Sequence, residues 1–168
     1  MVPGNVLETV AYGGGSVMVW VCISATCKMD LITIRGNLNA VRYQQEILER
    51  AVIPHFNNYS LATRPIFMDD NARPHRAHAV IQFMQQNATE TLPWPAMSPD
   101  LNPIEHLWDI LGRRVRQRDP PVTTLNELIV ALHEEWNGIP QNQIQRLIRG
   151  MRRRLEAVVR AGGGHTRY

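Results

Sequence analysis

The stretch SVMVWVCIS, residues 16–24, decides the fold, because it is an apolar run rich in β-branched and aromatic side chains that follows three glycines. Such a run is typical of a buried strand. Residues 30–35, DLITIR, alternate as a strand does and follow a short connection at residues 25–29. The two segments together predict an antiparallel hairpin that ends at Gly36.

Helical and strand patterns continue through the rest of the chain. Asn39 can cap a helix at residues 40–52, whose end is marked by Pro54. Asn102 and Pro103 are the cap and first-turn residues of another helix. The expected helices cover 40–52, 75–86, 103–118, 124–137 and 141–160, and short strands are expected at 65–69 and 89–92. This order indicates a single mixed α/β domain over residues 1–168, with helices gathered toward the C-terminus.

Length and composition exclude several classes of protein. The 168 residues suit one compact domain, and an apolar share of 44% with 20% charged residues argues against a disordered or fibrous chain. No apolar run is long enough to span a membrane, and the first ten residues do not resemble a secretory signal. The two cysteines cannot form a disulfide scaffold and fit a reducing compartment. We therefore expect a soluble intracellular domain with no membrane partner.

The basic residues are unevenly distributed along the chain. Residues 1–110 contain seven basic and ten acidic side chains, whereas residues 111–168 contain eleven basic and five acidic ones. All the basic residues except Lys28 are arginines, whose planar forks of donors bind phosphate, so the pattern favours nucleic acid as a partner. A solvated helical face would explain the same pattern. The candidate DNA-contacting arginines are Arg113, Arg114, Arg116, Arg149 and Arg153.

Two acidic residues lie at the ends of expected helices and strands, where catalytic and ligand-binding residues are often found. Asp70 follows the strand in PIFMDDNARPH, and Glu105 lies in the first turn of the helix in SPDLNPIEHLW. Carboxylates brought together from distant parts of a chain are the ligands that Mg²⁺ prefers, and two such ions can promote phosphodiester cleavage. Structural explanations compete with this one: Glu105 can complete a capping box with Asn102, and Asp69 and Asp70 can form turns with their own backbone.

His75, five residues after Asp70, also has two interpretations. It can be a catalytic or DNA-contacting imidazole, or a partly buried residue at the start of a helix. The residue spacing alone does not choose between them.

Three motifs carry a resemblance to a known family. The strings GGGSVMVWVCIS, FMDDNARPH and WPAMSPDLNPIEHLWDILGRRV closely resemble the catalytic domain of the Tc-like branch of the mariner-superfamily DDE transposases, from about residue 13 to about residue 136. The resemblance implies a ribonuclease-H-like fold, a mixed sheet flanked by helices, that cuts and joins DNA phosphodiesters during transposition. It also implies Mg²⁺ or Mn²⁺ as cofactor, transposon ends as DNA partner and a nuclear location. It is compatible with a homodimer.

The same resemblance assigns roles to the two acids. Asp70 and Glu105 match the second and third catalytic, metal-binding carboxylates of the family, and the 34 residues between them are typical of the Tc-like branch. The family's first Asp lies on a strand upstream of the hairpin, after a helix-turn-helix region, and we expect both to be missing here. The hairpin would then lack a neighbour, and catalysis would be impaired. The alternative is a non-catalytic, transposon-derived remnant that binds DNA through its arginine-rich helices at 124–160.

Overall fold

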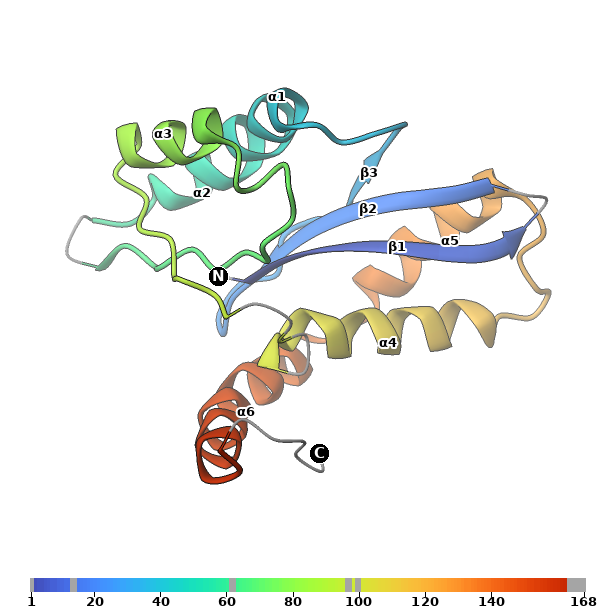
Figure 1. The fold of residues 1–168 in the computed structure, drawn as a ribbon. Helices are drawn as coiled ribbons and strands as arrows, with labels where there is room; N and C mark the ends of the chain where they lie inside the picture. The colour runs from blue at the N-terminus through green and yellow to red at the C-terminus, as the bar shows by residue number, and fades with distance from the viewer. Residues whose placement is uncertain (1, 13–14, 61–62, 96–97, 99–100, 163–168) are drawn as a thin grey trace.

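A computed structural model describes residues 15–60, 63–95, 98 and 101–162, together with the backbone of residues 2–12. Its sheet has three antiparallel strands in the order β1-β2-β3 (Figure 1). The strands are β1 (Val2–Tyr12), β2 (Gly15–Ile23) and β3 (Ile32–Ile34). The predicted hairpin is present as β2 and β3, which pair from Met18↔Ile34 to Trp20↔Ile32.

The expectation that this hairpin lacks a neighbouring strand is wrong. Strand β1 pairs with the other edge of β2, from Val2↔Ile23 to Glu8↔Val17, with a shift of register before Tyr12↔Gly15. A strand buried on both faces needs partners for its backbone groups on both edges, because no water reaches them. The segment before the three glycines folds back to supply those partners.

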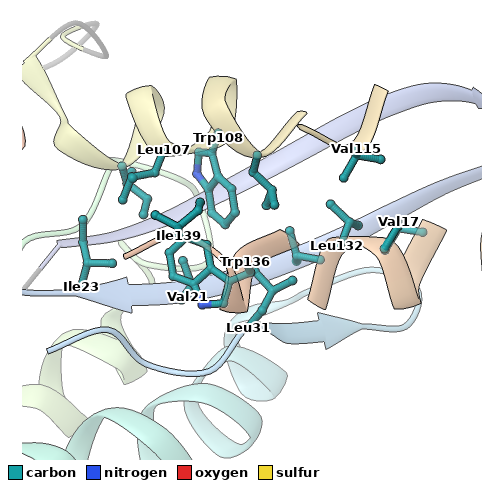
Figure 2. Close-up of a cluster of buried hydrophobic side chains, with 14 of the residues drawn as sticks. Val17, Val21, Ile23, Leu31, Leu107, Trp108, Val115, Leu132, Trp136 and Ile139 are labelled. Carbon is teal, nitrogen blue, oxygen red and sulfur yellow. The ribbon is translucent and has the colours of Figure 1, made fainter. Parts of the chain in front are cut away.

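Strand β2 is covered on both faces, and its side chains alternate between two cores. Val19 and Val21 point toward helices α4 and α5, whereas Trp20 and Cys22 point toward the helices that follow β3. Figure 2 shows the first core, where the rings of Trp108 and Trp136 lie 6.1 Å apart. This period of two is the ordinary geometry of a strand, and here both faces are apolar.

The helices form two groups on opposite faces of the sheet (Figure 1). One face is covered by α1 (Ala40–Arg42), η1 (Tyr43–Val52), α2 (Ile53–Phe56) and α3 (His78–Gln86). The other is covered by α4 (Pro103–Arg116), α5 (Leu125–Asn137) and the first part of α6 (Gln141–Arg160). No helix in the described part of the chain is long and apolar enough to cross a membrane.

Several predicted boundaries need correction. The first helical stretch continues past Pro54 to Phe56, because Pro54 lies in the first turn of α2, where a missing N–H costs little. Helix α3 begins at His78 and not at residue 75, and α4 ends at Arg116 and not at residue 118.

The strands predicted at 65–69 and 89–92 are reduced to a single parallel bridge between Phe67 and Thr91. The Phe67 N–H donates to the Glu90 carbonyl at 2.8 Å, and the Leu92 N–H donates to the Phe67 carbonyl at 2.7 Å. The bridge still places Asp69 and Asp70 at the end of an extended segment beside the sheet.

Candidate functional site

A cavity of about 190 Å³ lies where the segment after this bridge meets the first turn of α4. Both acids singled out in the sequence line it, Asp70 from the first segment and Glu105 from the helix. The lining residues are Asp70, Asn71, Trp94, Pro95, Ser98, Asn102 and Glu105. The structure therefore brings together two carboxylates that are far apart in the chain.

Asp70 is held in place by two groups of its own segment. Its Oδ1 accepts a hydrogen bond from the Ala72 N–H at 2.9 Å and lies 2.7 Å from Nδ1 of His75. Burial alone would raise the pKa of Asp70, but the contacts with His75 and the Ala72 N–H outweigh it and lower the pKa below its usual value. The turn expected as a structural alternative is thus formed, and it leaves the carboxylate ionised in the cavity.

His75 contacts Asp70 and is buried. Its residue is only 2% exposed, and its ring lies 4.2 Å from the ring of Tyr43. A side chain buried in this way cannot reach a DNA backbone without moving, so its geometry suits orienting Asp70 better than contacting a ligand.

Glu105 is half-buried and is not part of a capping box. Asn102 caps α4 by accepting from the Ile104 N–H at 3.3 Å, but no described residue donates a hydrogen bond to the Glu105 carboxylate. Burial raises the pKa of Glu105, and the negative charge of Asp70 raises it further. Two negative charges in one cavity disfavour each other. A bound cation would stabilise both carboxylates in their charged form.

The neighbouring Asp69 has a different environment. It is 5% exposed, its Oδ1 lies 3.2 Å from Nη2 of Arg76, and it lines a separate cavity of about 280 Å³ beside Tyr43 and His75. Burial raises its pKa to about 6, against the lowering effects of His75 and Arg76. Only the second of the two adjacent aspartates therefore lines the cavity shared with Glu105.

The residues present fit a small, hard cation. Asp70 and Glu105 offer carboxylate oxygens, and Mg²⁺ commonly binds through one or two carboxylates while keeping much of its water. Within the described residues, no group of three or more His, Cys, Asp or Glu side chains is placed to hold a metal ion. The protein part of such a site would be these two acids.

The arginines predicted to contact DNA fall into two separate groups. Arg113, Arg114 and Arg116 lie toward the C-terminal end of α4, where Arg116 is eleven residues, or about 16 Å, beyond Glu105. Arg149 and Arg153 are exposed on α6, which packs near the other end of α4 (Figure 1).

Four residues of the cavity wall, Asn71 among them, were not expected from the sequence. Trp94, Pro95 and Ser98 come from the loop before α4, and the Asn71 side-chain amide ties this loop to the acidic segment by donating to the Trp94 carbonyl at 3.1 Å. The available signal in the sequence was Trp94 between Pro93 and Pro95, because prolines are typical of a turn or loop.

Comparisons with known proteins find similar sequences along most of the chain. The family model described as DDE superfamily endonuclease matches residues 4–129. The Tcb1 transposase of the transposable element from Caenorhabditis briggsae is 37% identical over 160 residues, which are 95% of this chain and 57% of that protein. The chain thus spans little more than half the length of this curated relative.

Solved structures are similar over almost the whole chain. The Mos1 transposase catalytic domain with raltegravir and Mg has a TM-score of 0.83 at 24% identity, covering 99% of this chain and 85% of that one. A Mos1 transposase paired-end complex with the left transposon end has a TM-score of 0.79 at 23% identity, covering 99% of this chain and 56% of that one. The likeness confirms the predicted ribonuclease-H-like fold.

Proposed function

The chain belongs to the DDE superfamily endonucleases, and on that premise we propose that it is part of a Tc-like transposase catalytic domain that cuts and joins DNA phosphodiesters. The observation that carries the proposal is the shared cavity of Asp70 and Glu105, together with the raised pKa of Glu105. We propose transposon-end DNA as the substrate. We also propose a nuclear location and a homodimer, on the basis of the family resemblance alone.

In this proposal Asp70 and Glu105 would hold Mg²⁺ or Mn²⁺. When bound, such ions activate the attacking water and stabilise charge on the leaving oxygen of the phosphodiester. His75 and the Ala72 N–H engage Oδ1 of Asp70, so they orient the carboxylate that lines the cavity. Glu105 is fixed by the rigid first turn of α4, which Asn102 caps.

We also propose that cleavage by this chain is slow. Each metal ion must be positioned accurately, because a displacement of about 1 Å can cost on the order of a hundredfold in rate. Two carboxylates hold a pair of ions less firmly than three would. The alternative, a DNA-binding remnant without catalysis, is favoured by the same count of two acids among the described residues of the cavity wall.

Nicking of labelled supercoiled DNA in Mg²⁺ or Mn²⁺ tests the proposal, with Asp70→Asn and Glu105→Gln beside the unchanged chain. Glu49→Gln, an exposed acid on η1, serves as the matched control. Slow nicking that both site variants abolish and the control retains supports the endonuclease. DNA binding without any nicking supports the remnant, and nicking that survives both site substitutions overturns the assignment of the two acids.

A further inference from the structure

The guanidinium of Arg76 joins the two residues that flank Asp70 in the chain. Its Nη2 donates a hydrogen bond to Oδ1 of Asp69 at 3.2 Å, and its Nε donates to Oδ1 of Asn71 at 2.8 Å. The guanidinium is planar and presents its donors in a fixed fork, so the two bonds set where Asp69 and Asn71 lie relative to each other. We call Arg76 with Asp69 and Asn71 the Arg76 bridge.

The Arg76 bridge spans a turn that the backbone also closes. The Ala72 carbonyl accepts hydrogen bonds from the N–H of His75 at 2.9 Å and from the N–H of Arg76 at 3.2 Å. The Ala72 N–H donates to Oδ1 of Asp70 at 2.9 Å. The side chain of Arg76 therefore starts at the end of this turn and reaches back to its beginning. The orientation of Asp70 depends on a short segment whose two ends the bridge joins.

Asn71 connects the bridge to the loop before α4. Its Nδ2 donates to the Trp94 carbonyl at 3.1 Å, and both residues line the cavity of about 190 Å³ that holds the two acids. Arginine only donates and a carbonyl only accepts, so one orientation of the Asn71 amide satisfies both partners. By holding the amide oxygen, Arg76 directs the amide nitrogen toward Trp94. Trp94 packs against the core that α4 helps to form, so these contacts join the Asp70 segment to the loop that leads into the Glu105 helix.

Neutralising Asp69 does not account for the whole bridge. Asp69 is 5% exposed, and a buried carboxylate in its charged form needs a cationic partner. An ion pair with Arg76 alone would meet that need. The shorter of the two hydrogen bonds, however, goes to the uncharged Asn71, which is exposed and lines the cavity. That bond adds nothing to the charge balance, but it fixes a residue of the cavity wall.

We propose that Arg76 is a positioning residue, which through its bridge fixes how Asp70 and Glu105 lie relative to each other. The inference rests on the proposed function and deepens it, because it names what keeps the two acids in place before a cation binds. Residues that hold metal ligands in position commonly contribute about 10- to 100-fold to metal affinity. Lysine is a poor replacement, because one ammonium on a flexible stem can pair with Asp69 but offers no rigid fork to both partners.

A double-mutant cycle of Mn²⁺ affinity tests the proposal, with free Mn²⁺ followed by electron paramagnetic resonance. The cycle combines Arg76→Lys, which keeps a positive charge beside Asp69, with Asn71→Ala. We expect each single variant to bind Mn²⁺ about tenfold more weakly than the parent chain. The double variant should bind no more weakly than either single variant, because both substitutions break the same series of contacts.

Arg42→Lys is the matched control. Arg42 also forms a fork, from its Nε and Nη2 to Glu46, and its side chain is about as exposed as that of Arg76, but it lies on α1. This variant should bind Mn²⁺ as the parent chain does. Thermal unfolding in EDTA separates affinity from stability, and we expect the Tm of Arg76→Lys to differ from that of the parent no more than the Tm of Arg42→Lys does.

Hydrogen exchange of the Ala72 amide in EDTA is a second readout, and it needs no metal. This amide donates to Asp70, so its exchange rate reports how firmly that carboxylate is held. We expect the amide to exchange several-fold faster in Arg76→Lys than in the parent chain, and at the parent rate in Arg42→Lys.

Additive losses in the cycle would overturn the proposal, as would an equal loss of Mn²⁺ affinity in Arg42→Lys or Ala72 exchange at the parent rate in Arg76→Lys. Mn²⁺ binding that Asp70→Asn abolishes but Arg76→Lys leaves unchanged would refute the role of Arg76 alone. A parent chain that binds no Mn²⁺, or binding that persists in Asp70→Asn, would refute the metal site of the proposed function. Faster Ala72 exchange in Arg76→Lys would in that case still support the role of Arg76 in holding Asp70.

Discussion

Asp69 should lower the stability of the folded chain at neutral pH, whereas its neighbour Asp70 is stabilised in its charged form. Asp69 is 5% exposed, and burial raises its pKa from the usual 3.8 to about 6. Replacing Asp69 by Asn keeps the size of the side chain but removes the charge. We therefore expect Asp69→Asn to stabilise the protein above pH 7.

The magnitude follows from the two pKa values. Their difference of about 2 units corresponds to about 3 kcal/mol. Because the folded state holds this proton more tightly than the unfolded state, stability falls as the pH rises from about 4 through about 6 and levels off above it. At pH 8 the variant should be more stable by about 3 kcal/mol, or about 6–12 °C in Tm, and the difference should vanish toward pH 4.

Thermal unfolding in EDTA between pH 4 and pH 8 measures this difference, with Glu49→Gln as an exposed control that should follow the parent chain. A variant whose stability runs parallel to that of the parent at every pH would refute the reasoning. So would a variant that is less stable at pH 8, since it would show that the charge of Asp69 is favourable in the folded chain.

Three further outcomes are expected. Lys28→Met should cost about 2 kcal/mol in urea unfolding and Lys28→Arg less, because the Lys28 ammonium donates to the carbonyls of Trp136 and Ile139, each at 2.8 Å, at the end of α5. Leu107→Ala should cost about 2–5 kcal/mol by creating a void in the core of Figure 2, whereas the exposed Val130→Ala should change stability by less than about 0.5 kcal/mol. Mn²⁺ at about ten times its Kd should raise the Tm of the parent chain by about 3–6 °C and leave Glu105→Gln unchanged; an equal rise in the variant would place the ion elsewhere.

Local signals in the sequence predicted much of the fold. The apolar run in β2 predicted a buried strand, which the structure covers on both faces, and Asn102 caps α4 as expected. Strand β1 was not foreseen, because Pro3, Gly4 and Asn5 weaken its strand pattern and its pairing depends on the exposed edge of β2. The segments at 65–69 and 89–92 have strand-like residues, but they meet only at one bridge.

The candidate site was predictable in part. The motifs indicated Asp70 and Glu105, and the structure brings both to one cavity. Which arginines share a surface could not be predicted, because the angle at which α6 crosses α4 depends on packing between distant segments. The burial of His75 beneath Tyr43 depends on contacts of the same long-range kind. For that reason His106 and Arg160 were not singled out, although they line one cavity of about 880 Å³ together with Arg153.

The most direct test of the central claim is a Mn²⁺ titration followed by paramagnetic broadening of backbone amide resonances. If Asp70 and Glu105 hold the ion together, the amides of Asn71 and His106 should broaden in parallel at low Mn²⁺, and either Asp70→Asn or Glu105→Gln should abolish both effects. Broadening confined to one of the two segments, or broadening that persists in either variant, would contradict a metal site shared by these two acids.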